Sequence, residues 1–161
     1  MRTSVLSSAG ARSRGIEPII RPIESPGDVA ALRAAVLARP GGFALETLGA
    51  AGTSGGGRFS YFGCEPSRVV EAKADADPFG MLAERVFARR PGDARTRTPL
   101  PFIGGWVGYL AYETGGWLEP SARTQRVAAG LPSAWFAYHD AILAADRATG
   151  CLLYTSDAAD E

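Results

Sequence analysis

Several residue types that support common functions are scarce in this sequence. Its 161 residues include no asparagine, one lysine, one histidine and two cysteines. The absence of asparagine excludes N-glycosylation, and so few cysteines and histidines exclude a multi-cysteine zinc module and a disulfide framework. No apolar run approaches the roughly 20 residues of a membrane-spanning helix. The first fifteen residues also lack the apolar stretch of a secretory signal.

The balance of charge gives no sign of a polyanionic partner. Lysine and arginine together number 17, aspartate and glutamate also number 17, and the formal net charge is zero. Such a chain has no long-range field that attracts nucleic acid or an anionic lipid surface. We therefore expect a cytoplasmic protein that binds neither nucleic acid nor membranes. Its content of 46% hydrophobic and 21% charged residues is that of an ordinary globular domain.

The mixture of short apolar runs and turn residues predicts an α+β fold. Neighbouring strands are joined by short loops, which favours a largely antiparallel sheet with packed helices over a doubly wound parallel sheet. The stretch 131–146 is predicted to form a strand or a hairpin, and 146–150 a turn that leads into a further strand. The other expected strands cover residues 16–23, 43–48, 58–63, 68–72 and part of 101–113.

Two amphipathic helices are expected to pack on one sheet. Ser25 as N-cap and Pro26 at the first helical position begin the first helix. Asp77 and Pro78 begin the second in the same way, and Pro91 ends it. The apolar positions at helical spacing are Val29, Leu32 and Val36 in the first helix and Phe79, Leu82 and Val86 in the second.

Two glycine-rich segments resemble nucleotide-binding loops only superficially. The segment 52–58 lacks the Gly-Lys-Ser/Thr that opens a helix in a phosphate-binding loop, so a flexible hairpin loop is predicted. In the second segment, Gly104, Gly105 and Gly108 are not followed by the helix start of a dinucleotide-binding fold. Their spacing instead suits a strand that another backbone approaches closely.

Neither the histidine nor Cys64 has the neighbours of a catalytic residue. His139 beside Asp140 could serve as a general base. No serine or cysteine nucleophile motif accompanies it, so a structural or surface role is the preferred interpretation. Cys64 has no metal-binding partner nearby and is expected to be a small buried residue.

The residues around Glu46 have the chemistry that binds an amino acid. Glu46 and Thr47 follow an apolar strand, and the glycine-rich loop is expected to bring Arg58 and Phe59 back alongside. A carboxylate or hydroxyl can meet an ammonium group, and an arginine with backbone N–H groups can meet a carboxylate. The simpler alternative is an exposed strand end with an ordinary salt bridge.

Five segments match one protein family when they are taken in order. Together they resemble the N-terminal domain of component I of the chorismate-utilising enzymes, a family that includes aminodeoxychorismate synthase and anthranilate synthase. The similarity covers approximately residues 16–150. The segments are Leu45-Glu46-Thr47; Gly57 to Gly63 with Pro66; Asp77-Pro78-Phe79; Pro101-Phe102, Gly104-Gly105, Gly108-Tyr109 and Tyr112-Glu113; and Leu131-Pro132, Trp135-Phe136, Tyr138 and Asp140.

This resemblance implies part of an enzyme that aminates chorismate. The family's component I takes ammonia from a glutamine amidotransferase partner, and a C-terminal chorismate-binding domain carries the active site and the Mg²⁺ ligands. Motifs of that domain are not present, so the resemblance implies an incomplete, inactive N-terminal domain of a two-layer enzyme. The stretch from Gly104 to Glu113 resembles the aminodeoxychorismate synthases of p-aminobenzoate and folate biosynthesis. Anthranilate synthase, which belongs to tryptophan biosynthesis, stays open as the alternative.

The resemblance also implies a tryptophan site on this domain. The family signature is Leu-Leu-Glu-Ser followed by Gly-Arg-Tyr-Ser-Phe, and here Thr47 stands where serine is usual. A regulatory tryptophan-binding module or an amidotransferase-docking module is the alternative of a different class. The implied pocket residues are Glu46, Thr47, Gly57, Arg58 and Phe59, and no catalytic or metal-binding residue is assigned within the chain.

The two ends of the sequence differ in texture from its middle. Residues 1–15 are rich in serine, alanine, glycine and arginine and are interpreted as a disordered leader. Residues 151–161 match the one-frame translation of a transposase-type sequencing adapter. We therefore interpret 16–150 as the truncated native domain and 151–161 as not native.

Overall fold

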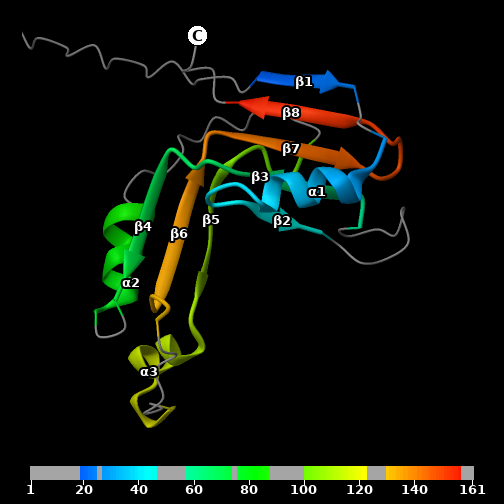
Figure 1. Ribbon diagram of the computed structural model, residues 1–161. Coiled ribbons are helices and arrows are strands. Elements are labelled where there is room, and N and C mark those ends of the chain that lie inside the picture. The colour runs from blue at the N-terminus through cyan, green and yellow to red at the C-terminus, as the bar shows by residue number, and fades with distance from the viewer. Residues whose placement is uncertain are drawn as a thin grey trace, which may run out of the picture.

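The computed structural model describes residues 19–24, 27–46, 57–73, 76–87, 100–122 and 130–156. Within these residues the strands form two antiparallel sheets (Figure 1). The fold is α+β with mostly antiparallel pairing, as predicted. The strands are β1 (Ile19–Ile23), β2 (Phe43–Leu45), β3 (Phe59–Gly63), β4 (Arg68–Ala72), β5 (Gly105–Leu110), β6 (Ala134–His139), β7 (Ala141–Asp146) and β8 (Leu152–Ser156).

Strands from distant parts of the chain lie side by side in each sheet. The five-stranded sheet has the order β1-β8-β7-β3-β2, and the three-stranded sheet has the order β4-β6-β5. Short helices flank the sheets. They are α1 (Val29–Leu37), α2 (Pro78–Met81) with its π-helical continuation η1 (Leu82–Val86), the 3₁₀ helix η2 (Tyr112–Thr114), α3 (Gly115–Leu118) and the 3₁₀ helix η3 (Pro120–Ala122).

One stretch of chain belongs to both sheets. β6 is the central strand of the three-stranded sheet, β7 pairs with β3 and β8 in the other sheet, and Asp140 alone separates them. Figure 1 shows the sharp change of direction between β6 and β7. The hairpin predicted as one option over 131–146 is wrong, because the two halves pair with different strands and not with each other.

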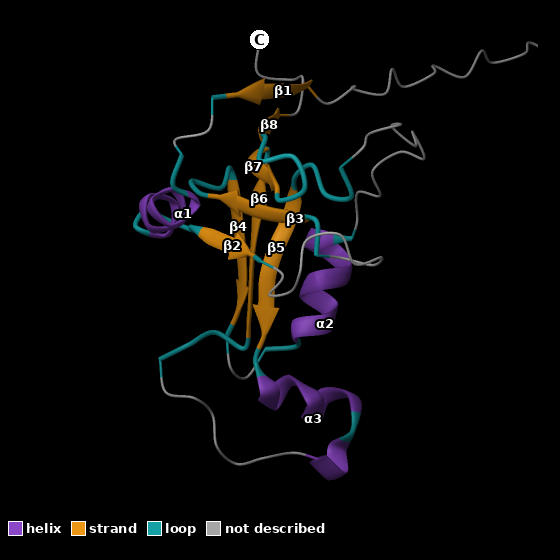
Figure 2. Ribbon diagram, turned by 90° about the vertical axis from the view of Figure 1, so that its right-hand side faces the viewer, coloured by secondary structure: helices purple, strands orange, loops and turns teal. Residues whose placement is uncertain are grey.

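The two main helices lie on different sheets, which corrects the expectation of one shared sheet. α1 contacts β2 and β3, whereas α2 contacts β4 (Figures 1 and 2). The helical spacing of apolar residues shows that each helix has a buried face, but it does not say which strands that face meets. Val36, Leu82 and Val86 are the buried members of the predicted apolar positions.

The helix caps follow the sequence signals in one case and not in the other. Asp77 caps α2 by accepting a hydrogen bond from the backbone N–H of Phe79 at 2.9 Å, and Pro78 is the first helical residue, as predicted. For α1 the cap is Asp28, which accepts from the backbone N–H of Ala30 at 2.8 Å. The prediction of Ser25 as the cap is therefore wrong. Residues 25, 26 and 91 lie outside the described residues.

A small apolar core lies between α1 and the five-stranded sheet. Val36 of α1, Phe62 of β3, Ala145 of β7 and Leu152 of β8 form its centre. Cys64, which was expected to be buried, is half-buried against this cluster. Phe62 is fully buried, and burial of an aromatic side chain of this size contributes roughly 1.5–3 kcal/mol.

β8 fills the place predicted for the strand after the turn at 146–150. The Gly150 N–H donates to the Asp146 carbonyl at 2.7 Å, and the Asp146 N–H donates to the Cys151 carbonyl at 2.8 Å, which closes the turn. β8 then pairs with β7 on one side and β1 on the other. Its residues belong to the segment interpreted as not native. Its backbone ladder does not depend on side-chain identity, and Leu152 adds a side-chain contact with the core.

The predicted close approach of backbones in the glycine-rich strand is confirmed. A Cβ atom at Gly108 of β5 would overlap the Trp135 carbonyl and crowd Phe136 of β6. Gly108 and Phe136 are register partners in the ladder. Among the described residues, we find no helix that has both the length and the apolar character needed to cross a membrane.

Candidate functional site

The end of β2 carries the acid that the sequence singled out. β2 and β3 pair antiparallel, with Leu45 opposite Tyr61, and Glu46 follows directly. The Oε2 atom of Glu46 accepts a hydrogen bond from Nη1 of Arg33 in α1 at 3.2 Å. Both side chains are partly exposed, so this ion pair contributes little to stability and can be exchanged for another partner. Such a salt bridge at an exposed strand end is what the sequence predicted as the simpler alternative to an amino-acid site.

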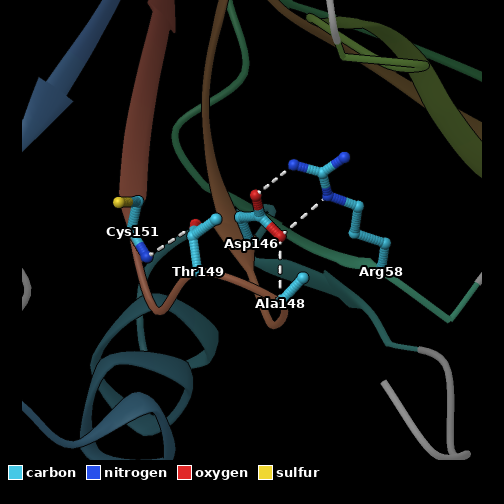
Figure 3. A network of polar contacts seen from close by, with 5 residues as sticks. All are labelled: Arg58, Asp146, Ala148, Thr149 and Cys151. Carbon is cyan, nitrogen blue, oxygen red and sulfur yellow. Dashed lines mark hydrogen bonds and ion pairs between the residues drawn. The ribbon is translucent and has the colours of Figure 1, made fainter. Parts of the chain in front are cut away.

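Arg58 is bound to Asp146, at the end of β7. Its Nε donates to Oδ1 at 3.0 Å and its Nη2 to Oδ2 at 2.7 Å, a bidentate pair (Figure 3). The Asp146 side chain is only 6% exposed. Bidentate arginine–carboxylate pairs are among the stronger polar contacts in proteins. Arg58, predicted to hold a ligand carboxylate, is therefore already occupied by a carboxylate of the protein.

This ion pair also keeps the Asp146 carboxylate charged. The hydrogen bonds from Arg58 hold the pKa of Asp146 well below its ordinary value, against the opposing effect of burial. The Ala148 N–H adds a hydrogen bond of 3.0 Å to Oδ1 (Figure 3). Because the pKa is lowered in the folded state, this stabilisation is present above the unfolded value of about 3.9 and is lost as the pH falls below it.

Two of the remaining predicted residues, Gly57 and Phe59, lie next to the Arg58–Asp146 ion pair. Gly57 is buried, and its carbonyl accepts a hydrogen bond from Nη1 of Arg147 at 3.1 Å. The Phe59 ring lies beneath the Arg58 guanidinium, 4.9 Å from its central carbon. Thr47 lies outside the described residues. Gly57, Arg58 and Phe59 therefore hold the start of β3 against the turn after β7.

A cavity of about 220 Å³ lies between α1, β3 and the turn after β7. Of the predicted site residues, Glu46 lines it, whereas Gly57, Arg58 and Phe59 do not. Its walls are mainly apolar, with Glu46 and Asp146 as the acidic members and Arg147 as the basic one. The lining residues are Val29, Leu32, Glu46, Ser60, Ala145, Asp146, Arg147, Gly150, Cys151 and Leu152.

The sequence reasoning missed Asp146 and Arg147 as site residues. The available signal was an acid followed by a base at the end of an apolar strand. Asp146 and Arg58 are 88 positions apart, and only the pairing of β3 with β7 brings them together. Short-range spacing carries no information on such a contact.

The other candidate residues lie apart from the cavity. His139 is 2% exposed at the end of β6 and is not among the lining residues, so of the structural and surface positions expected for it the structure shows a buried one. In the part of the chain that the structure describes, no group of three or more histidine, cysteine, aspartate or glutamate side chains could hold a metal ion.

No protein-family model matches the chain, and a search of the curated proteins returns no match. The functional assignment therefore rests on the ordered motifs and on the geometry of the residues around Glu46.

Proposed function

We propose that the chain is the N-terminal part of component I of an aminodeoxychorismate synthase. The whole enzyme would aminate chorismate to 4-amino-4-deoxychorismate, using ammonia from a glutamine amidotransferase partner. The Mg²⁺ ligands and the chorismate site would belong to a catalytic domain outside these residues. In this assignment the chain contributes scaffold and regulation, because none of its residues is assigned a catalytic role.

The pairing of the motif segments is the observation that supports the proposal most. The segment Leu45-Glu46-Thr47 begins at the last residue of β2, and the segment from Gly57 to Gly63 contains its neighbour β3. The segment around Gly108 forms β5, which pairs along its length with β6, the strand of Trp135 and Phe136. The first pair lies in the five-stranded sheet and the second in the three-stranded sheet, so each pairing joins two of the motif segments.

Component I of anthranilate synthase is the second candidate. The same ordered motifs support it, because the two enzymes share the N-terminal domain. The run from Gly104 to Glu113 favours the aminodeoxychorismate type. Thr47 in place of the usual serine favours it as well, since a weakened tryptophan signature suits an enzyme outside tryptophan biosynthesis.

The cavity beside Glu46 is the proposed binding site for L-tryptophan. The ligand ammonium would replace Arg33 at the Glu46 carboxylate, and the side chains of Val29 and Leu32 would contact the indole. Arg147 lines the cavity and Arg58 does not, so Arg147 is the basic residue proposed to meet the ligand carboxylate, and it would do so beside its hydrogen bond to the Gly57 carbonyl. The same site would serve the alternative of a regulatory amino-acid-binding module.

Calorimetry with L-tryptophan tests this site. We expect binding to the intact chain, and Glu46→Gln should weaken it at least about tenfold, because a hydrogen bond to a charged group contributes about 1.5–3 kcal/mol. Glu71→Gln is the matched control, since Glu71 is an exposed acid of β4 in the other sheet. A folded sample that releases no heat would remove tryptophan binding from the proposal.

Genetic complementation tests the proposed enzyme. Residues 16–150 joined to the catalytic domain of an aminodeoxychorismate synthase component I, together with its amidotransferase, should restore growth of a p-aminobenzoate auxotroph. A matched fusion to an anthranilate synthase catalytic domain in a tryptophan auxotroph tests the second candidate. The chain alone should restore neither, and growth with the chain alone would place an active site within it.

A further inference from the structure

The imidazole of His139 has no hydrogen-bond partner, and it lies at the point where the chain passes from one sheet to the other. Its side chain is 2% exposed, and neither Nδ1 nor Nε2 forms a hydrogen bond. It is the last residue of β6, and only Asp140 separates it from β7. Buried polar groups in proteins are nearly always hydrogen-bonded, so an imidazole with two unpaired nitrogens needs an explanation.

The imidazole at the end of β6 packs against both β2 and β3. The Phe43 ring of β2 lies edge-on to it, with ring centroids 4.7 Å apart. A Cβ atom at Gly63 of β3 would lie 3.3 Å from Nδ1, so no free space separates that strand from the ring. Phe43 and Gly63 are register partners in the β2–β3 pair. One ring therefore supports the end of this pair.

This environment accommodates the neutral imidazole and not the cation. An imidazolium has two N–H donors and needs acceptors or water for both. Burial lowers the pKa of His139. The Cys64 backbone, which approaches the ring without reaching hydrogen-bond geometry, and the Asp140 carboxylate have smaller effects that raise it. Asp140 follows the ring in the chain, and Cys64 follows β3. The described parts of β2 and β5 present no charged side chain to it.

β2 is the element that an opened contact would release first. It is three residues long, lies at the edge of its sheet and pairs with β3 alone. β7 and β8 lie inside the sheet, with a partner on each side. Short edge elements open at lower cost than central strands. β2 leads directly to Glu46, so its release would also move an acid that lines the cavity.

We propose that His139 is a pH-sensitive latch. Its protonation breaks the contact with Phe43, releases β2 from the end of β6 and displaces Glu46 from the cavity. The release of β2 is independent of the proposed function. Only its consequence for a ligand rests on that function.

Proton linkage gives the direction and size of the effect. The open state binds a proton more readily than the closed state, so the latch is fully closed above the ordinary histidine pKa of about 6.5 and opens as the pH falls below it. Uptake of one proton raises the opening equilibrium by up to about tenfold per pH unit. The chain contains a single histidine, so the ring signal of histidine reports on this site alone.

Hydrogen exchange of the intact chain at pH 7.5 and 5.5, corrected for the intrinsic exchange rates, tests the latch. We expect the amides of β2 to lose up to about tenfold in protection, with a smaller loss in β7 and β8. His139→Phe keeps the ring contact with Phe43 but cannot be protonated, and it should abolish the pH effect. His139→Gln is the second non-titrating variant if the phenylalanine does not fold.

Three results would overturn the proposal. Unchanged protection of β2 at pH 5.5 would show that protonation does not open the contact. An equal loss in β2, β7 and β8 would show global unfolding in place of local release. Persistence of the pH effect in the non-titrating variant would assign it to another group. None of these readouts involves tryptophan or chorismate, so failure here is distinguishable from failure of the proposed function.

Discussion

Replacing Gly108 by alanine is expected to destabilise the fold by about 3 kcal/mol, because overfilling a well-packed contact costs about 1–3 kcal/mol or more. A Cβ atom at this position would overlap the Trp135 carbonyl, which is backbone and cannot rotate away. The strands β5 and β6 would have to separate, and their ladder is the main pairing of the three-stranded sheet.

Gly115→Ala is the matched control for this substitution. Gly115 lies in α3, has no positive φ, and a Cβ atom there meets nothing within 4 Å. Alanine at such a site is expected to be neutral or stabilising by up to about 1 kcal/mol. Chemical denaturation of both variants provides the comparison. Equal stability of Gly108→Ala and the unchanged chain would show that β5 and β6 are not in close contact.

The second large effect is expected for Phe62→Ala, which should cost about 3–5 kcal/mol as a buried aromatic truncation. Phe62 is fully buried in β3, opposite Ala44 on one side and Leu143 on the other. It fills the centre of the core between α1 and the five-stranded sheet. A domain of ordinary stability has only about 5–15 kcal/mol in total, so this variant would lose a large share of it.

Phe87→Ala provides the comparison at an exposed phenylalanine. Phe87 follows η1 and is 66% exposed, so its truncation should change stability by no more than about 0.5 kcal/mol. Urea denaturation should show a lower midpoint for Phe62→Ala with an unchanged slope. A midpoint shift no larger than that of Phe87→Ala would mean that the core lies elsewhere.

Local sequence signals predicted the elements of this fold well, and long-range arrangement poorly. The Asp77-Pro78 pair marks the start of α2 because capping depends on neighbouring residues alone. The division into two sheets has no such signal. A strand that ends in one sheet and a strand that begins in the next, as on either side of Asp140, look the same in sequence as a continuous strand.

In the candidate site, too, local signals identified residues, but the contacts between distant residues could not be predicted. Glu46 was identified from its position after an apolar strand, and the structure places it at the cavity. Arg58 was identified from its chemistry, which was correct in kind, because it does bind a carboxylate. That carboxylate belongs to Asp146, from a strand far along the chain, and only the sheet order reveals it.

The most direct test of the proposed identity is to sequence the genomic locus beyond codon 150 by a method without transposase adapters. The proposal predicts that the reading frame continues past Gly150 into a chorismate-binding domain, with other residues in place of 151–161. A continuation without such a domain would contradict the assignment to component I, and recovery of the same eleven codons would contradict the interpretation of 151–161 as not native.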